Sequence, residues 1–99
     1  MASVLRKTLS PSIREIRILC CQTSASSLGT RQFVINTYET LKKANPDLPI
    51  MIREAKGTPA RAFARFERGV ERHVSLEGLD EKSVGDKIGE LVTNSSTAA

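Results

Sequence analysis

Two adjacent cysteines, Cys20 and Cys21, are the residues of this 99-residue chain whose type and spacing could support covalent chemistry. The sequence CQTS at residues 21–24 has the C-x-x-S spacing of a monothiol redox motif. In such sites the attacking thiol lies at a helix N-terminus, where the helix dipole lowers its pKa. Here a serine-rich loop that we expect to be flexible separates Cys21 from the predicted N-cap, Ser27, and Ser24 cannot close a disulfide. We therefore interpret Cys20 as a core residue and Cys21 as a semi-buried strand-end thiol, and keep Cys21 as the redox candidate.

Other kinds of chemistry find less support. The single histidine, His73, lies between charged residues without a second histidine or a cysteine at zinc-ligand spacing, so we interpret it as a surface residue. The carboxylates are scattered among arginines, and the glycines form no phosphate-binding loop. The sequence therefore predicts no catalytic, cofactor-binding or metal site.

The charge pattern points to an acidic partner. The chain carries a formal charge of +4, and six of its fifteen basic residues lie between residues 53 and 72. Such an excess suits RNA or an acidic protein face, although a solvated surface is the ordinary explanation. We take three of these arginines as candidates for contact with a partner protein: Arg53, Arg65 and Arg68.

Two phenylalanines among these arginines bear on the RNA alternative. Phe63 and Phe66 alternate with basic residues, an arrangement that could stack on and clamp RNA. The alternative, which we favour, is that Phe66 packs inward while Arg65 points to solvent on the other face of a strand.

Hydrophobic periodicity predicts the elements that position these residues. Alternation over residues 13–20 predicts a strand. A helix is predicted over 28–44, with a stripe of Val34, Tyr38 and Leu41 widened by Ile35, and it ends at Asn45-Pro46.

The second half of the chain predicts more strand than helix. Residues 48–54 are nearly all apolar, which favours a strand covered on both sides. A hairpin that turns at residues 67–69 follows, and then a helix capped by Asp80 with Leu79 and Val84 as a hydrophobic staple. The order β-α-β-β-β-α predicts an α/β domain: a four-stranded mixed sheet with two helices packed on it, a reduced thioredoxin-like architecture.

Length and composition predict one soluble domain at residues 13–93. No apolar run approaches the roughly 20 residues that span a bilayer, and the start lacks the apolar stretch of a secretory signal. We expect flexible ends at 1–12 and 94–99. The basic, hydroxylated and acid-free start fits a mitochondrial import signal, or an ordinary disordered N-terminus.

Three stretches together resemble a known family. They are REIRI (14–18), LKKANPDLPIMIRE (41–54) and F-A-R-F-x-x-G-x-E-x-x-V-x-L (63–76). This pattern closely resembles the thioredoxin-like accessory subunits of mitochondrial respiratory complex I, collinearly from about Arg14 to Val92. The resemblance implies a non-catalytic subunit without cofactors on the matrix side of the inner membrane. It would dock on the large iron–sulfur subunit of the peripheral arm and support assembly or stability.

The resemblance also bears on the alternatives. Animal members have a second cysteine after the IRE of the second strand, which could pair with the one matched by Cys21, whereas this chain has Ala55. A redox switch is therefore not implied. Relatives with the same domain are mitochondrial ribosomal proteins, so an rRNA-binding protein is the second hypothesis. A monothiol redox protein, which predicts a depressed pKa for Cys21, is the third.

Overall fold

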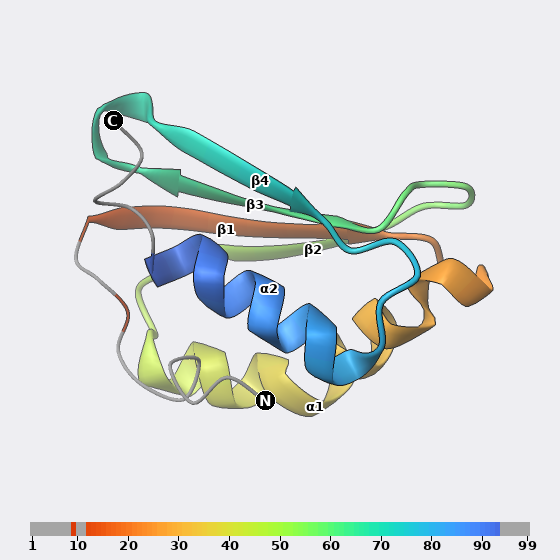
Figure 1. Ribbon diagram of the computed structural model, residues 1–99. Helices are drawn as coiled ribbons and strands as arrows, with labels where there is room; N and C mark the ends of the chain where they lie inside the picture. Colours follow the sequence, from red (N-terminus) through yellow and green to blue (C-terminus); the bar gives the residue numbers. More distant parts are fainter. Residues whose placement is uncertain (1–8, 10–11, 94–99) are drawn as a thin grey trace.

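The computed structural model describes residue 9 and residues 12–93. Four strands and two α-helices make up the domain, joined by two short 3-10 turns (Figure 1). Their order and bounds are β1 (Ile13–Cys20), η2 (Ala25–Ser27), α1 (Leu28–Ala44), β2 (Ile50–Glu54), β3 (Arg61–Phe66), η3 (Glu67–Gly69), β4 (Glu71–Ser75) and α2 (Glu81–Thr93). The α/β class, the four-stranded mixed sheet and the two helices are as predicted. The predicted flexible segments, 1–12 and 94–99, lie largely outside the described residues.

The sheet has the strand order β2-β1-β3-β4. β1 pairs in parallel with β2, and antiparallel pairs join β1 to β3 and β3 to β4. The hairpin of β3 and β4 turns at residues 67–69, where it was predicted, with Arg68 at φ 62° and Gly69 at φ 75°. Left-handed backbone of this kind costs little at glycine but is uncommon for arginine.

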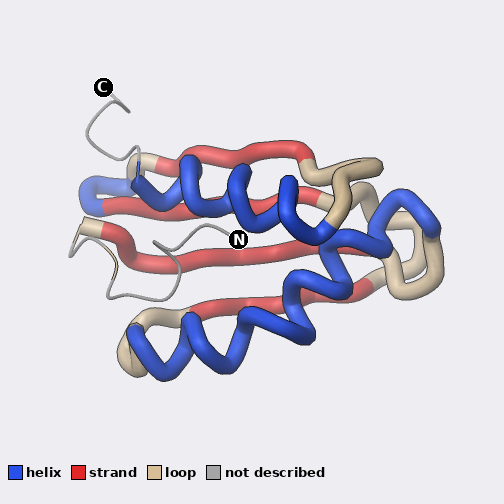
Figure 2. Tube along the Cα trace, turned by 60° about the horizontal axis from the view of Figure 1, so that its bottom comes forward, coloured by secondary structure: helices blue, strands red, loops and turns tan. Residues whose placement is uncertain are grey.

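Both helices lie on the same face of the sheet (Figures 1 and 2). The connection between β2 and β3, residues 55–60, is too short for a helix that could cover the other face. The prediction that β2 is covered on both sides was wrong, because β2 is an edge strand and its apolar residues remain partly exposed. Among the described residues, no helix therefore lies over the other face of the sheet.

The hydrophobic core lies between the sheet and the helices. Cys20 is buried in it, as expected from the alternation in β1, and so is Phe66 at the end of β3. Among the described residues the largest fully buried apolar side chains are Phe33, Ile16, Ile18, Leu41, Leu76, Ile88, Val84 and Val92. Leu9, in the segment before β1, is also buried, and its amide donates to Oδ1 of Asn45 (2.8 Å).

Helix α1 has the predicted bounds, but only part of its predicted stripe is buried. Leu41 is buried and Val34 packs partly buried against the core, as predicted, whereas Ile35 and Tyr38 face solvent. Ile35 is 80% exposed and Tyr38 37% exposed, while Phe33, Thr37 and Leu41 are buried together with Gly29 and Thr30. At the start of α1 a residue without a side chain, Gly29, faces inward, because the backbone of Leu79 and Asp80, just before α2, lies close to it. A Cβ atom on Gly29 would lie 2.0 Å from the carbonyl oxygen of Leu79. The rotation of α1 is therefore set by a contact with a segment fifty residues away in sequence.

The start of α1 also differs in detail from the prediction. Ser27 occupies the N-cap position, but its side chain does not cap the helix. Its Oγ instead accepts from the Cys21 amide (3.1 Å), and the 3-10 turn η2 leads into α1. The helix ends as predicted at Asn45, whose Nδ2 donates to the carbonyl of Leu41 (3.1 Å).

Helix α2 has the predicted cap and stripe. The Ser83 amide donates to Oδ1 of Asp80 (2.8 Å), and Val84 and Ile88 are fully buried, with Leu79 packed against the same core. Among the described residues, no peptide bond is cis, Thr58–Pro59 included, and no helix combines the length and apolar character needed to cross a membrane.

Removing the Asp80 cap is expected to lower Tm by a few degrees, because the Ser83 amide then loses its acceptor. That hydrogen bond also holds the pKa of the Asp80 carboxyl below its usual value. The stabilisation is therefore present above the unfolded-state pKa and is lost as pH falls through the native pKa. In thermal melts at neutral pH, the Tm of Asp80→Ala should lie below that of the parent protein. This difference in Tm should become smaller in acid. Asp80→Asn, which keeps an acceptor, is the control, and a gap independent of pH would contradict the assignment.

Candidate protein-docking surface

The face of the sheet away from the helices carries most of the polar and charged side chains of the strands. We call it the open face. Strand register places its residues in rows across the four strands. Its members are Glu15, Arg17, Leu19, Met51, Arg53, Arg61, Phe63, Arg65, Glu71, His73 and Ser75.

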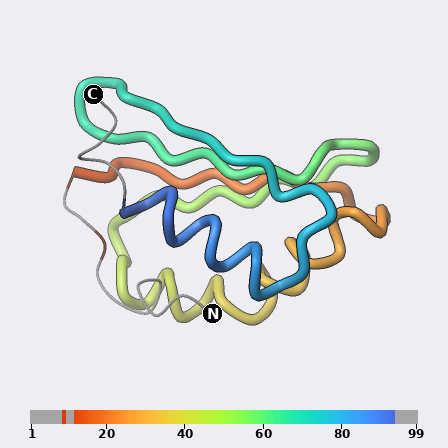
Figure 3. The backbone as a smooth tube through the Cα atoms, viewed as in Figure 1, coloured from red at the N-terminus to blue at the C-terminus, as the bar shows by residue number. Residues whose placement is uncertain are grey.

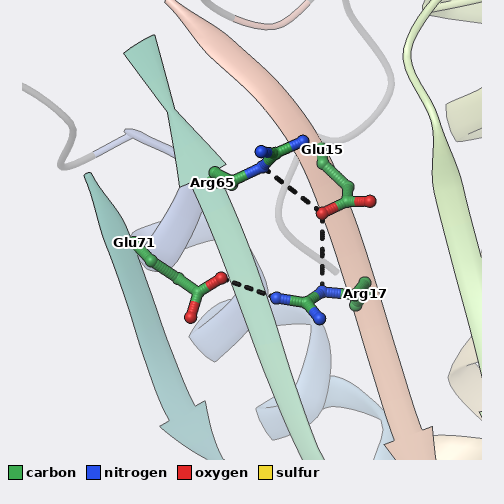
Figure 4. A network of polar contacts seen from close by, with 4 residues as sticks. All are labelled: Glu15, Arg17, Arg65 and Glu71. Carbon is green, nitrogen blue, oxygen red and sulfur yellow. Dashed lines mark hydrogen bonds and ion pairs between the residues drawn. The ribbon is translucent and has the colours of Figure 1, made fainter. Parts of the chain in front are cut away.

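A network of ion pairs occupies one end of the open face (Figure 4). Arg17 in β1 donates to Glu71 in β4 across β3 (2.6 Å). Oε1 of Glu15 lies 3.5 Å from Nε of Arg17 and 3.5 Å from Nε of Arg65. Glu15 is the least exposed of the residues in this network. Exposed ion pairs add little stability, but a network held on three strands fixes the positions of its side chains. Two of the four arginines on this face therefore already have carboxylate partners.

Phe63 lies at the centre of the open face. The guanidinium carbon of Arg17 is 5.3 Å from the ring centroid and that of Arg61 is 5.5 Å from it. The His73 ring packs against Phe63 with a centroid separation of 5.6 Å. The two arginine distances are within the range at which a cation is attracted to an aromatic ring. Phe63 is thus a half-buried aromatic side chain whose position is supported from several sides.

The three arginines predicted from the sequence lie in different settings. Arg53 and Arg65 belong to the open face, on β2 and β3, whereas Arg68 lies in the turn between β3 and β4. Arg65 is paired with Glu15. Arg61, which is not among the three predicted arginines, also belongs to the open face. Within the part of the chain that the structure describes, neither Arg53 nor Arg61 forms an ion pair.

Phe66 and Arg65 lie on opposite faces of β3, as the favoured alternative predicted. Phe66 is buried in the core and Arg65 points away from it. Phe63 lies on the opposite face from Phe66, among arginines. An aromatic side chain flanked by arginines on an exposed sheet face can bind another protein or a nucleobase. The charges of the neighbouring side chains distinguish between these two kinds of partner.

The Cys21 loop lies at one end of the sheet, where the connection between β2 and β3 also projects (Figure 3). Cys21 is 4% exposed, so it is buried rather than semi-buried as predicted. The loop was also expected to be flexible, but Arg31 donates from Nη1 to the carbonyls of Cys21 and Ser24, both at 2.9 Å. Ala55 adjoins this end, with its amide donating to the Cys20 carbonyl (3.1 Å).

Backbone amides surround the Cys21 thiol. Hydrogen bonds from the amides of Thr23, Gly57 and Ser24 lower the pKa of the Cys21 thiol to about 7, and the Gly57 nitrogen lies 3.3 Å from Sγ. Burial raises the pKa of Cys20, with the charge of Glu54 as a smaller cause. Both cysteines are free. The depressed pKa that the monothiol hypothesis requires is therefore present, but it arises from loop amides rather than from α1, and no partner thiol accompanies it.

Alkylation with iodoacetamide should distinguish the two thiols. In a Cys20→Ala variant the rate of Cys21 labelling is expected to rise with pH to a midpoint near 7, because only the thiolate reacts. In Cys21→Ser the remaining Cys20 should show a midpoint above the ordinary thiol value of about 8.5. Burial slows both reactions without moving the midpoints. A Cys21 midpoint at or above about 8.5 would contradict the amide contacts.

No metal centre is found in the described part of the chain, where no three His, Cys, Asp or Glu side chains could hold an ion together. The predicted surface position of His73 is confirmed, with its ring packed on Phe63. Among the described residues, the candidate functional site is therefore the open face, whose side chains suit it to binding another molecule.

Comparison with known families assigns the chain. A family model described as "Mitochondrial ribosomal protein L51 / S25 / CI-B8 domain" matches residues 30–81, more than half of the sequence. The chain belongs to this family. The matched region of the L51 / S25 / CI-B8 domain runs from the first turn of α1 to the start of α2 and includes β2, β3 and β4.

Three curated relatives of the chain carry the names of complex I subunits. "NADH dehydrogenase [ubiquinone] 1 alpha subcomplex subunit 2" of Arabidopsis thaliana is 45% identical over 94 residues, 95% of this chain and 97% of the relative. The "NADH-ubiquinone oxidoreductase 10.5 kDa subunit" of Neurospora crassa is 42% identical over 92% of this chain and 97% of the relative. The Mus musculus subunit with the same name as the Arabidopsis one is 44% identical over 73% of each chain. The resemblance noted in the sequence is thereby confirmed.

Proposed function

We propose that this chain is a non-catalytic accessory subunit of mitochondrial complex I, the NADH:ubiquinone oxidoreductase. The observation that carries the proposal is its identity of 45% with a plant complex I subunit over nearly the full length of both chains. Fungal and mouse relatives with complex I names support it. The protein is then mitochondrial, and its partners are other complex I subunits.

We further propose a location and a partner for the domain, both of which the resemblance supports. We place the domain, residues 13–93, on the matrix side of the inner membrane, docked on the large iron–sulfur subunit of the peripheral arm. Its parallel β1–β2 pair and antiparallel β3–β4 hairpin support a reduced thioredoxin-like fold. Arg53, Arg65 and Arg68 remain the candidates for partner contact, since guanidinium groups pair with carboxylates through two parallel hydrogen bonds.

The proposed supporting role depends on the isolation of the Cys21 thiol and on the open face of the sheet. Cys21 has neither a partner thiol nor free access to solvent, so a supporting role in assembly or stability of the peripheral arm suits the chain better than electron transfer. The uncovered sheet face provides a surface through which such a role could be exercised.

Deletion of the gene followed by re-expression tests this role. We expect deletion to reduce the amount of assembled complex I on native gels. Re-expression of the parent chain and of Cys21→Ser should restore it equally, because the thiol is not required. Normal assembly after deletion would contradict the proposal, and failure of Cys21→Ser alone would favour the monothiol alternative.

A mitochondrial ribosomal protein is the second candidate, because the family description includes ribosomal L51 and S25 proteins and Phe63 lies among arginines. Glu15 and Glu71 argue against it, since their carboxylates occupy the open face and would repel phosphates. RNA binding would weaken steeply as the salt concentration rises. Retention of the protein on ribosomal particles in low salt, with loss in high salt, would favour this candidate.

A further inference from the structure

We infer that the open face, centred on Phe63 and the unpaired Arg53 and Arg61, is the docking surface for an acidic, extended segment of a neighbouring subunit. The inference rests on the proposed function for the identity of the neighbour. It goes beyond that function in naming the face, the anchoring residues and the chemistry of the segment that binds.

The open face has the composition of a protein interface. Neither helix covers it (Figure 2), yet Leu19, Met51 and Phe63 are only partly exposed on it. Interface cores are enriched in aromatic residues, methionine and arginine relative to other surfaces, and a few such residues contribute most of the binding energy. Half-buried apolar side chains surrounded by guanidinium groups therefore mark this face as a surface to be covered.

Charge is distributed unevenly over the open face. At one end Arg17 and Arg65 are matched by Glu15 and Glu71 (Figure 4). At the other end Arg53 and Arg61 lie in the row of Leu19 and Ser75, without a carboxylate among the described residues of that row. The unmatched charge is positive and confined to one end, so the complementary surface is acidic there.

Geometry restricts the acidic partner. Arg53 and Arg61 flank β1 from β2 and β3, so two strand spacings, about 10 Å, separate their backbones. On one face of an extended segment, carboxylates two or four residues apart are about 7 or 13 Å apart, which brackets this separation. The Arg61 guanidinium carbon lies 5.5 Å from the centroid of the Phe63 ring, and a guanidinium placed over a ring can still donate from its edge to a carboxylate.

Two other occupants fit the surface less well. A second copy of this chain would offer Glu15 and Glu71 on its own open face, but Arg17 and Arg65 already pair with these carboxylates. Arg53 and Arg61 would therefore gain no free acidic partner. RNA would meet Glu15 and Glu71 at the end opposite to Arg53 and Arg61. An acidic protein segment satisfies the unpaired arginines and leaves the existing network intact.

Photo-crosslinking in the assembled complex tests the inference. A benzoylphenylalanine in place of Met51 lies on the open face next to the proposed anchors without removing one. The same group in place of Ile35, which is 80% exposed on α1, is the matched control on the opposite side of the molecule. We expect the probe at 51 to form an adduct with an acidic segment of another complex I subunit.

Charge reversal gives the second readout. Arg53→Glu with Arg61→Glu should reduce the adduct from position 51 at least tenfold, since each removes a charge-assisted contact and adds a repulsion. Lys82→Glu with Lys87→Glu makes the same change of charge on α2 and should leave the adduct unchanged. Thermal melts of all variants verify that the fold is retained.

The outcomes separate the inference from the function on which it rests. Presence of the chain in complex I without an adduct from position 51, or with an adduct to RNA or to a non-acidic segment, overturns the inference and leaves the function standing. Absence from complex I together with an adduct to an acidic segment of another protein overturns the function and retains the docking surface. A pair of arginine reversals without effect on the adduct also overturns the inference.

Discussion

Replacing Phe33 with alanine is expected to lower the free energy of unfolding by about 3–5 kcal/mol, the usual cost of emptying a buried aromatic site. Phe33 is 1% exposed and is the largest of the fully buried side chains that the structure describes. Its removal leaves a cavity in the hydrophobic core, and closely packed cores relax only partially around such a cavity. Small domains are stable by about 5–15 kcal/mol, so the variant should be close to unfolding. Urea unfolding followed by circular dichroism measures the loss.

Ile35→Ala is the matched control in the same helix. Its side chain is 80% exposed, so we expect a change within about 0.5 kcal/mol, with a slight gain from the better helix propensity of alanine. If α1 were instead rotated so that the stripe predicted from its sequence faced the core, Ile35→Ala would cause the large loss of stability and Phe33→Ala the small change. A large loss in Ile35→Ala and a small one in Phe33→Ala would therefore refute the packing of α1.

Gly29→Ala is expected to destabilise the domain, although alanine normally improves a helix by about 1 kcal/mol. The new Cβ would lie 2.0 Å from the Leu79 carbonyl oxygen and 2.8 Å from the carbonyl carbon of Asp80. Both are backbone atoms, so no side-chain rotation relieves the clash and α1 must move away from the segment before α2. Overpacking of this kind costs roughly 1–3 kcal/mol and sometimes more, so we expect a net loss of about 2 kcal/mol.

Thr40→Ala, at an exposed position of α1, provides the reference for helix propensity alone. It should be neutral or slightly stabilising in the same urea experiment. If Gly29→Ala behaved like Thr40→Ala, the close approach of α1 to Leu79 would be incorrect.

Local signals in the sequence account for the elements that were predicted well. Helix α1 has its predicted bounds because Asn45-Pro46 and a polar loop act within a few residues of its ends. The Asp80 cap and the hairpin turn are equally local. The rotation of α1 was missed because it depends on the contact of Gly29 with Leu79, which no periodicity in α1 reports.

The candidate site depends still more on distant contacts. The alternation in β1 indicates that Arg17 points away from the core, but its pairing with Glu71 spans 54 residues and depends on the register of three strands. Arg61 was overlooked for the same reason, since only the pairing of β1 with β3 places it beside Leu19. The pKa of Cys21 depends on the Gly57 amide, 36 residues away. The basic character of the segment was visible in the sequence, whereas its division into matched and unmatched arginines was not.

Our proposals for this member of the L51 / S25 / CI-B8 family are membership of complex I and binding through the open face of its sheet. Native electrophoresis of detergent-solubilised mitochondria, with detection of the chain by an antibody, tests the first proposal directly. We expect the chain to migrate with assembled complex I, and we expect Arg53→Glu with Arg61→Glu to shift it to the free fraction. Migration of the chain exclusively with ribosomal particles would contradict its membership of complex I.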